Sequence, residues 1–108
     1  MRIIYTKSYE NSVKKLKRHK SELELLDEIL SFIKKQPDFI SLSSDPLNKM
    51  YNFERLKYEN NEFYSFRLSK IIRLLVKPKD NYIELYLIYV SMDHYKDFNK
   101  GKVIYYDE

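Results

Sequence analysis

The second half of the sequence contains polar residues whose types could together cleave a phosphodiester. They are one glutamate, one lysine, two arginines and an adjacent histidine and tyrosine: Glu54, Lys57, Arg67, Arg73, His94 and Tyr95. A carboxylate can accept a proton, an imidazolium can donate one, and guanidinium groups can offset the charge that builds on a phosphate in its transition state. These are the groups that a metal-free ribonuclease requires.

The two arginines lie in segments where every second residue is apolar. The apolar residues are Tyr64, Phe66 and Leu68 around Arg67, and Ile72, Leu74 and Val76 around Arg73. This alternation predicts two strands whose arginines both face away from the core. In a hairpin that turns near Ser69 and Lys70 the two guanidinium groups could converge on one anion, and they suit a phosphate better than lysine does. The alternative is a solvated sheet face with salt bridges, which is the commoner explanation for such a pair taken alone.

The other candidates also have simpler explanations. Strict alternation puts Glu54 on the same face as Leu56, which resembles a core residue, so a bulge or the end of the strand must separate them. A single histidine such as His94 is more often structural or exposed than catalytic, and Tyr95 is one of 11 tyrosines. Most tyrosines serve in packing.

Composition limits the kinds of protein that this chain can be. Its 108 residues suffice for one domain, which we expect to span residues 1–108. The absence of cysteine excludes disulfides and cysteine-bound metals, and two histidines make a metal site unexpected, so we expect no cofactor. A net charge of +4 permits a polyanionic partner without requiring one. We find neither a signal peptide nor an apolar stretch of about 20 residues, so we expect a cytoplasmic protein without membrane contact.

The first part of the chain indicates a strand followed by two helices. Residues 1–5 are mostly β-branched or aromatic, as in a short strand, and an amphipathic helix follows from Lys7. Ser21 and Glu24 have the spacing of a capping box, which predicts the start of a second helix that Pro37 ends. Together these two segments predict a helical hairpin.

The rest of the chain indicates a loop and then strands. Residues 37–49 are rich in turn formers and predict the one long loop. The predicted strands are Tyr51–Tyr58, Phe63–Leu68, Ile71–Lys77 and Tyr82–Val90. The last of these is the longest and is expected to be central, because it is apolar on both faces. Residues 99–108 could add an edge strand or stay frayed.

These elements predict an α+β fold. An N-terminal strand and a helical hairpin precede a mainly antiparallel run of four strands that packs on the helices. The other face of the sheet would then be free to carry a functional site.

Three segments of the sequence resemble a known family. They are FERLK at residues 53–57, FYSFRLSKIIRLLV at residues 63–76, and SMDHYKDF at residues 91–98. Their order and spacing are similar to the RelE/ParE superfamily of toxins from bacterial toxin–antitoxin pairs, and most similar to its YoeB-like mRNA interferases. The resemblance covers about residues 1–98 and includes the order of strand, two helices and sheet.

The resemblance implies a ribosome-dependent mRNA endoribonuclease. Such an enzyme cuts mRNA in the ribosomal A site by attack of the ribose 2′-OH on the neighbouring phosphate, which leaves a 2′,3′-cyclic phosphate and a 5′-OH. It also implies a cognate antitoxin protein that blocks the site. The basic run from Lys14 to Lys20 could bind ribosomal RNA, although such a run is more often only a solvated face.

The resemblance also assigns roles to the polar residues. The catalytic residues would be Glu54, Arg73, His94 and Tyr95, and the substrate-binding residues would be Lys57 and Arg67. The glutamate would accept the 2′-OH proton and the histidine would protonate the departing 5′ oxygen. The arginines would offset the charge of the transition state, the tyrosine would orient the phosphate or stack on a base, and the lysine would hold the RNA backbone.

Two other functions are compatible with the same sequence. One is a ParE-like inhibitor of DNA gyrase, which poisons its target without catalysis. The other is an inactive RNA-binding module on the same scaffold. Fold alone does not decide between them, but the co-occurrence of Glu54, Arg73 and His94 argues against the gyrase inhibitor.

Overall fold

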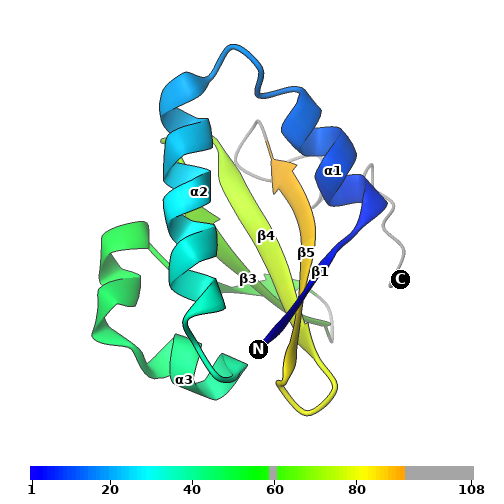
Figure 1. Ribbon diagram of the computed structural model, residues 1–108, viewed down its shortest axis with the longest axis vertical. Coiled ribbons are helices and arrows are strands. Elements are labelled where there is room, and N and C mark those ends of the chain that lie inside the picture. Colours follow the sequence, from blue (N-terminus) through cyan, green and yellow to red (C-terminus); the bar gives the residue numbers. More distant parts are fainter. Residues whose placement is uncertain (59–60, 92–108) are drawn as a thin grey trace.

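A single strand and then the helices come first along the chain, and the remaining strands follow (Figure 1). The computed structural model describes residues 1–58 and 61–91. The helices are α1 (Lys7–Lys14), α2 (Lys20–Lys34), α3 (Phe39–Ser44) and the 3₁₀ helix η1 (Pro46–Tyr51). The strands are β1 (Arg2–Tyr5), β2 (Glu54–Tyr58), β3 (Asn61–Arg67), β4 (Arg73–Lys79) and β5 (Glu84–Ser91). None of the helices in these two ranges is long and apolar enough to cross a membrane.

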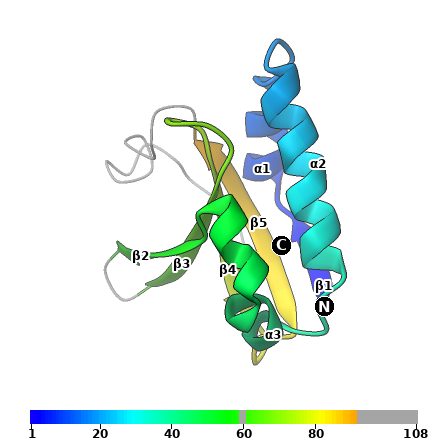
Figure 2. The same cartoon turned by 90° about the vertical axis from the view of Figure 1, so that its left-hand side faces the viewer.

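The strands form one mixed sheet of five strands in the order β1-β5-β4-β3-β2. The strands β2 to β5 are antiparallel to their neighbours, whereas β1 lies parallel to β5. Figure 2 shows α1 and α2 on one face of this sheet. The expected α+β fold is therefore confirmed, with its N-terminal strand, its helical hairpin and its antiparallel run of four strands.

The main core lies between the helices and this face of the sheet. Its helical side includes Leu16, Leu26, Ile29 and Ile33, and its sheet side includes Phe66, Leu68, Ile72, Leu74, Val76, Leu85, Leu87 and Val90. All of these side chains are buried. The alternation predicted for β3 and β4 is thus confirmed, because the residues that flank the two arginines point into the core.

The opposite face, called the outer face below, is not free as the sequence suggested. It carries a second buried apolar cluster of Phe63, Leu75, Tyr86 and Ile88. The ammonium groups of Lys77 and Lys79 lie 5.2 and 5.0 Å from the ring centres of Phe63 and Tyr86. The apolar residues that alternate with the core residues along these strands therefore form a separate cluster, which lies beneath basic side chains. Only part of the outer face is polar.

A β-bulge in β5 sets which of its residues face the core. Leu75 is paired with Tyr89 and Val76 with Leu87, so Ile88 is the extra residue. Leu87 and Val90, three positions apart, can then both lie in the main core, while Ile88 joins the outer cluster. The prediction that β5 is apolar on both faces is confirmed.

Two buried hydroxyl groups connect α1 to the bulged part of β5. The Thr6 hydroxyl donates to the carbonyl oxygen of Leu87 at 2.7 Å and accepts from the backbone N–H of Tyr9 at 3.1 Å, which caps α1. The Ser12 hydroxyl donates to the carbonyl oxygen of Tyr9 at 2.7 Å and accepts from the N–H of Val90 at 2.9 Å. Both residues are buried, so water cannot replace these bonds.

Three local predictions are wrong. The helix α2 begins at Lys20, before the expected capping box, because the carbonyl oxygen of His19 already accepts from Leu23 N–H at 3.0 Å. His19 is the N-cap and makes no side-chain capping bond, so Ser21 does not cap the helix. The middle position of the sheet belongs to β4, and β5 is an interior strand only because β1 pairs with its other edge.

The predicted loop at residues 37–49 is mostly helical. Asp38 caps α3 through a 2.7 Å bond from Ser41 N–H, and Asp45 caps η1 through a 2.9 Å bond from Leu47 N–H. Aspartate is both a turn former and a strong N-cap, and proline at position 46 suits the first turn of a helix. The composition of this segment therefore fits short capped helices as well as a loop.

Removal of the Thr6 hydroxyl should destabilise the protein without creating a cavity. Thr6→Val keeps the shape of the side chain but loses the cap of α1 and a donor to β5. We expect the free energy of unfolding to fall by about 1 to 3 kcal/mol, measured by urea denaturation followed by circular dichroism. Ser43→Ala is the control, since this exposed hydroxyl bonds only within α3, and it should change stability by less than about 0.5 kcal/mol. Equal effects of the two changes would contradict this account of Thr6.

Candidate functional site

Strand pairing brings the predicted arginines together. Arg67 and Arg73 are directly opposite each other at the end of the β3–β4 hairpin, and Arg73 is also paired with Ser91 of β5. Like charges at directly opposite positions repel each other. Two guanidinium groups at paired positions are suited to binding one anion such as a phosphate.

The candidate general base lies on the same face. Glu54 is paired with Ser65, which alternates with the core residues of β3 and therefore belongs to the outer face with Arg67. Diagonal neighbours across a sheet have Cα atoms about 7 to 8 Å apart, which is within reach of glutamate and arginine side chains. Glu54 is thus placed beside the arginine pair.

The expected conflict between Glu54 and Leu56 does not arise. Leu56 is paired with Phe63 and packs against the outer cluster instead of the main core. Both residues therefore face outward, and β2 keeps a regular register without a bulge. The expectation of a bulge or a strand end assumed only one apolar core, and the sheet has an apolar cluster on each face.

Exposure differs among these groups. Glu54 and Arg67 are exposed, whereas Arg73 is 3 % exposed. A buried guanidinium is restrained by its surroundings and can act as a fixed positive charge. The two exposed side chains are accessible to a ligand that reaches the edge of this face.

The remaining predicted residues are only partly described. Lys57 lies in β2, three residues after Glu54, and its backbone is paired with that of Glu62. His94 and Tyr95 lie outside the described residues. The strand that precedes them in the sequence ends at Ser91, the partner of Arg73.

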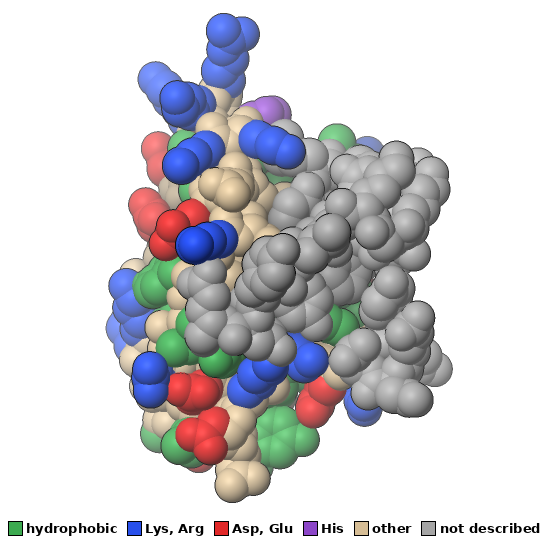
Figure 3. Space-filling view, turned by 90° about the vertical axis from the view of Figure 1, so that its right-hand side faces the viewer, with side chains coloured by type: hydrophobic (Ala, Val, Ile, Leu, Met, Phe, Trp, Pro, Cys, Tyr) green, Lys and Arg blue, Asp and Glu red, His purple; other side chains and the backbone are tan. Residues whose placement is uncertain are grey.

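A second basic surface lies at the connection between α1 and α2. Figure 3 shows Lys and Arg side chains gathered at that end of the molecule. The exposed residues there are Lys14, Lys15, Lys17, Arg18 and Lys20. The ion pairs of Arg2 with Glu84 and of His19 with Glu22 involve none of these five cations, so within the described part of the chain they are open to solvent or to a polyanion.

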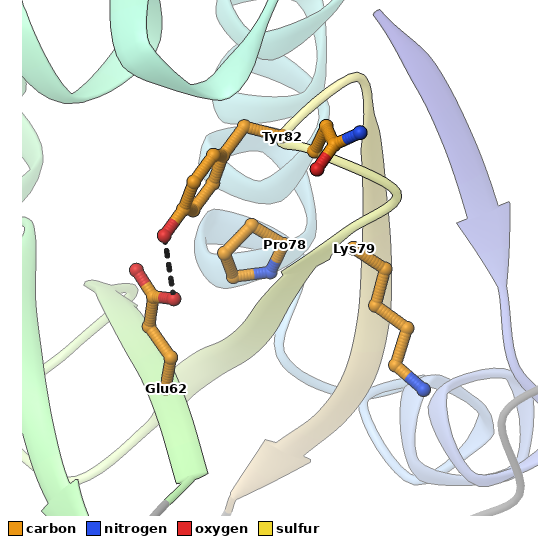
Figure 4. A pocket seen from close by; sticks show the side chains of 5 residues that line it. Glu62, Pro78, Lys79 and Tyr82 are labelled. Carbon is orange, nitrogen blue, oxygen red and sulfur yellow. Dashed lines mark hydrogen bonds between the residues drawn. The ribbon is translucent and has the colours of Figure 1, made fainter.

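A pocket that the sequence did not indicate lies near the β4–β5 turn. Its volume is about 260 Å³, and it is lined by Glu62, Pro78, Lys79, Asn81 and Tyr82. Figure 4 shows the Tyr82 hydroxyl directed at the Glu62 carboxylate, while the Lys79 side chain extends away from both. The pocket is therefore built around a polar contact between β3 and the turn.

The carboxylate of Glu62 binds two tyrosine hydroxyls. Tyr64 donates to it at 2.7 Å and Tyr82 at 3.1 Å. Burial, and then the hydrogen bond to Glu62, raise the pKa of Tyr64 to about 12. The bond to Glu62 is the main cause that raises the pKa of Tyr82. Since both carboxylate oxygens already have donors from the fold, we regard this cluster as structural.

The same cluster restrains an unusual turn. Asp80, Asn81 and Tyr82 have φ angles of 52°, 54° and 70°. Asp and Asn adopt this left-handed region more readily than most residues, whereas a bulky tyrosine seldom does. The carbonyl oxygen of Tyr82 accepts a 2.8 Å bond from Phe39 N–H, and the two rings stack with centroids 6.0 Å apart. These contacts join the turn to the start of α3.

Comparison with known proteins adds no relative. No family model matches the chain, and no curated protein matches it significantly. The functional argument therefore depends on the residues and their placement.

Tyrosine ionisation should destabilise the fold at high pH. The pKa of Tyr64 is raised from 10.0 to about 12 in the folded state, so the unfolded chain loses this proton at lower pH than the folded chain does. The stabilisation is complete below pH 10 and is lost as the pH rises toward 12. We therefore expect the free energy of unfolding to fall over this interval, measured by urea denaturation at each pH.

Two variants separate the causes. Tyr64→Phe keeps the ring and removes the ionising group, so it should weaken the pH dependence. Glu62→Gln removes the neighbouring negative charge and should lower the pKa of both Tyr64 and Tyr82, as seen by tyrosinate absorbance during an alkaline titration. An unchanged titration in Glu62→Gln would show that the carboxylate does not control these tyrosines.

Proposed function

We propose that this chain is the toxin of a toxin–antitoxin pair, with the RelE-like arrangement and YoeB-like chemistry that its sequence resembles. It would act as a ribosome-dependent mRNA endoribonuclease. The observation that carries the proposal is the direct pairing of Arg67 with Arg73 and the position of Glu54 diagonally across from Arg67 on the same face. A phosphate bound by the exposed Arg67, with the buried positive charge of Arg73 beside it and a carboxylate next to it, is the arrangement that proton abstraction from a neighbouring ribose hydroxyl needs.

The proposed reaction is an internal transfer of the phosphate. Glu54 takes the proton from the 2′-OH, and the 2′ oxygen forms a bond to phosphorus. The bond from phosphorus to the 5′ oxygen breaks, and His94 supplies the proton that this oxygen needs. The products are a 2′,3′-cyclic phosphate and a 5′-OH, so the step requires neither water nor a redox partner.

The other residues support the charge and position of the phosphate. Arg73 is buried and acts as a fixed positive charge that offsets the negative charge building on the phosphate in the transition state. Arg67 is exposed and contacts the phosphate from the solvent side. Tyr95 orients the phosphate or stacks on a base, and Lys57 holds the RNA backbone. The roles of His94 and Tyr95 rest on the sequence resemblance and on their place after β5.

The partners follow from the same proposal. The basic residues at the α1–α2 connection are exposed and would contact ribosomal RNA. The mRNA in the ribosomal A site would at the same time occupy the candidate site around Glu54 and the arginines. A cognate antitoxin would block the site in unstressed cells. Both interactions belong to the cytoplasm, where translation takes place.

The first test compares RNA ends made by the wild-type chain and by site variants. Glu54→Gln, Arg73→Gln and His94→Gln should each lower cleavage of ribosome-bound mRNA by about a hundred- to ten-thousandfold. Glu24→Gln is the matched control, because it removes an exposed carboxylate on α2 and should leave cleavage unchanged. Circular dichroism should give the same folded spectrum for all of these variants.

A substrate change tests the chemistry itself. A 2′-deoxyribose at the nucleotide before the scissile phosphate should abolish cleavage while most phosphate contacts remain. Cleavage at the deoxy position, or products with a 5′-phosphate, would contradict the proposed reaction. Loss of gyrase supercoiling activity without RNA cleavage would favour the ParE-like alternative, and RNA binding without cleavage would favour an inactive module.

A further inference from the structure

One buried hydroxyl group on the outer face has no hydrogen-bond partner. Ser65 is 0 % exposed, and among the described residues its Oγ and the Oδ1 of Asn48 are the buried side-chain polar atoms that lack a partner. The buried hydroxyls of Thr6 and Ser12, in contrast, each donate and accept. A buried unpaired hydroxyl is costly, and it is often retained where a functional state supplies the partner.

The position of this hydroxyl points to its partner. Ser65 is directly opposite Glu54 on β2 and opposite Leu75 on β4. Along β3 its neighbours on the same face are Phe63 and Arg67. Of these four residues only Glu54 carries an acceptor oxygen in its side chain, since a guanidinium can only donate.

The burial of Ser65 also limits what can reach it. RNA could not contact a hydroxyl that is fully covered, but the adjacent Glu54 side chain is exposed and lies within its reach. Cβ atoms of directly opposite residues are about 4.5 to 5.5 Å apart, so a rotamer of the glutamate can bring its carboxylate to the serine Oγ.

We propose that Ser65 is a positioning residue for the reaction: its hydroxyl donates a hydrogen bond to the Glu54 carboxylate and holds it against the 2′-OH of the RNA. This inference rests on the proposed endoribonuclease function. The bond holds the carboxylate in one position beside the arginine pair, and the serine hydroxyl gains its missing partner. Because Ser65 does not touch the RNA, it affects the rate of cleavage and not the affinity for RNA.

The test is a double-mutant cycle on cleavage of ribosome-bound mRNA. Ser65→Ala should lower kcat by about ten- to a hundredfold, the effect of a lost hydrogen bond to a charged group, and leave KM unchanged. Ser65→Thr keeps a hydroxyl and should restore most of kcat. In the Glu54→Gln background, Ser65→Ala should have little further effect, because the carboxylate on which it acts is already absent.

Two controls separate this role from a structural one. Ser43→Ala removes an exposed hydroxyl from α3 and should leave kcat and KM unchanged. Thermal melting of each variant identifies loss of fold. If Ser65→Thr unfolds at a lower temperature because its extra methyl group does not fit, the double-mutant cycle with Ser65→Ala still tests whether Ser65 acts through Glu54.

The outcomes distinguish the inference from the function on which it rests. If wild-type protein cleaves RNA and Glu54→Gln does not, an unchanged kcat in Ser65→Ala overturns the role of Ser65 alone. An equal loss from Ser65→Ala in both backgrounds overturns it as well, since the serine would then act independently of Glu54. If wild-type protein does not cleave RNA at all, the proposed function and this inference both fail.

Discussion

The extra residue Ile88 in β5 is the constraint on which the arrangement of the sheet depends. It reverses the inward and outward phase of the strand, so that Leu87 and Val90 both reach the main core. The hydroxyls of Thr6 and Ser12 bind the backbone on either side of it and fix α1 at the same place. The register beyond the bulge pairs Arg73 with the last residue of β5. The packing of the main core, the position of α1 and the pairing of Arg73 at the candidate site thus all depend on the bulge at Ile88.

Most elements could be predicted because their signals are local. Alternation around Phe66 and Leu74 identified β3 and β4 with the correct inward faces, and helical spacing identified α1 and α2. The start of α2, the helices between Pro37 and Lys49, the middle position of β4 and the apolar outer face were not predicted. Each of these depends on which of several capping residues is used or on which strands become neighbours. The spacing of apolar residues along the sequence gives no information on either.

The candidate site was predictable where it depends on a short hairpin. A turn near Ser69 and Lys70 predicts that Arg67 and Arg73 lie at the same end of the hairpin, and the register pairs them directly. Ser65 was missed because a serine within a strand gives no signal until its burial and its neighbours are known. His94 and Tyr95 remain predictions, since they lie outside the described residues.

The parallel pairing of β1 with β5 has a consequence for the order of folding. Arg2 is paired with Glu84, a separation in sequence of 84 − 2 = 82 residues, whereas the β2–β3 and β3–β4 pairs are hairpins of neighbouring strands. Contacts of such long range form late, because the loop between them must be closed first. During synthesis β1 leaves the ribosome without its partner strand and must wait for residues 84–87 to emerge before it can pair. The hairpins of the sheet can form earlier, and the first strand of the chain is then among the last to be added.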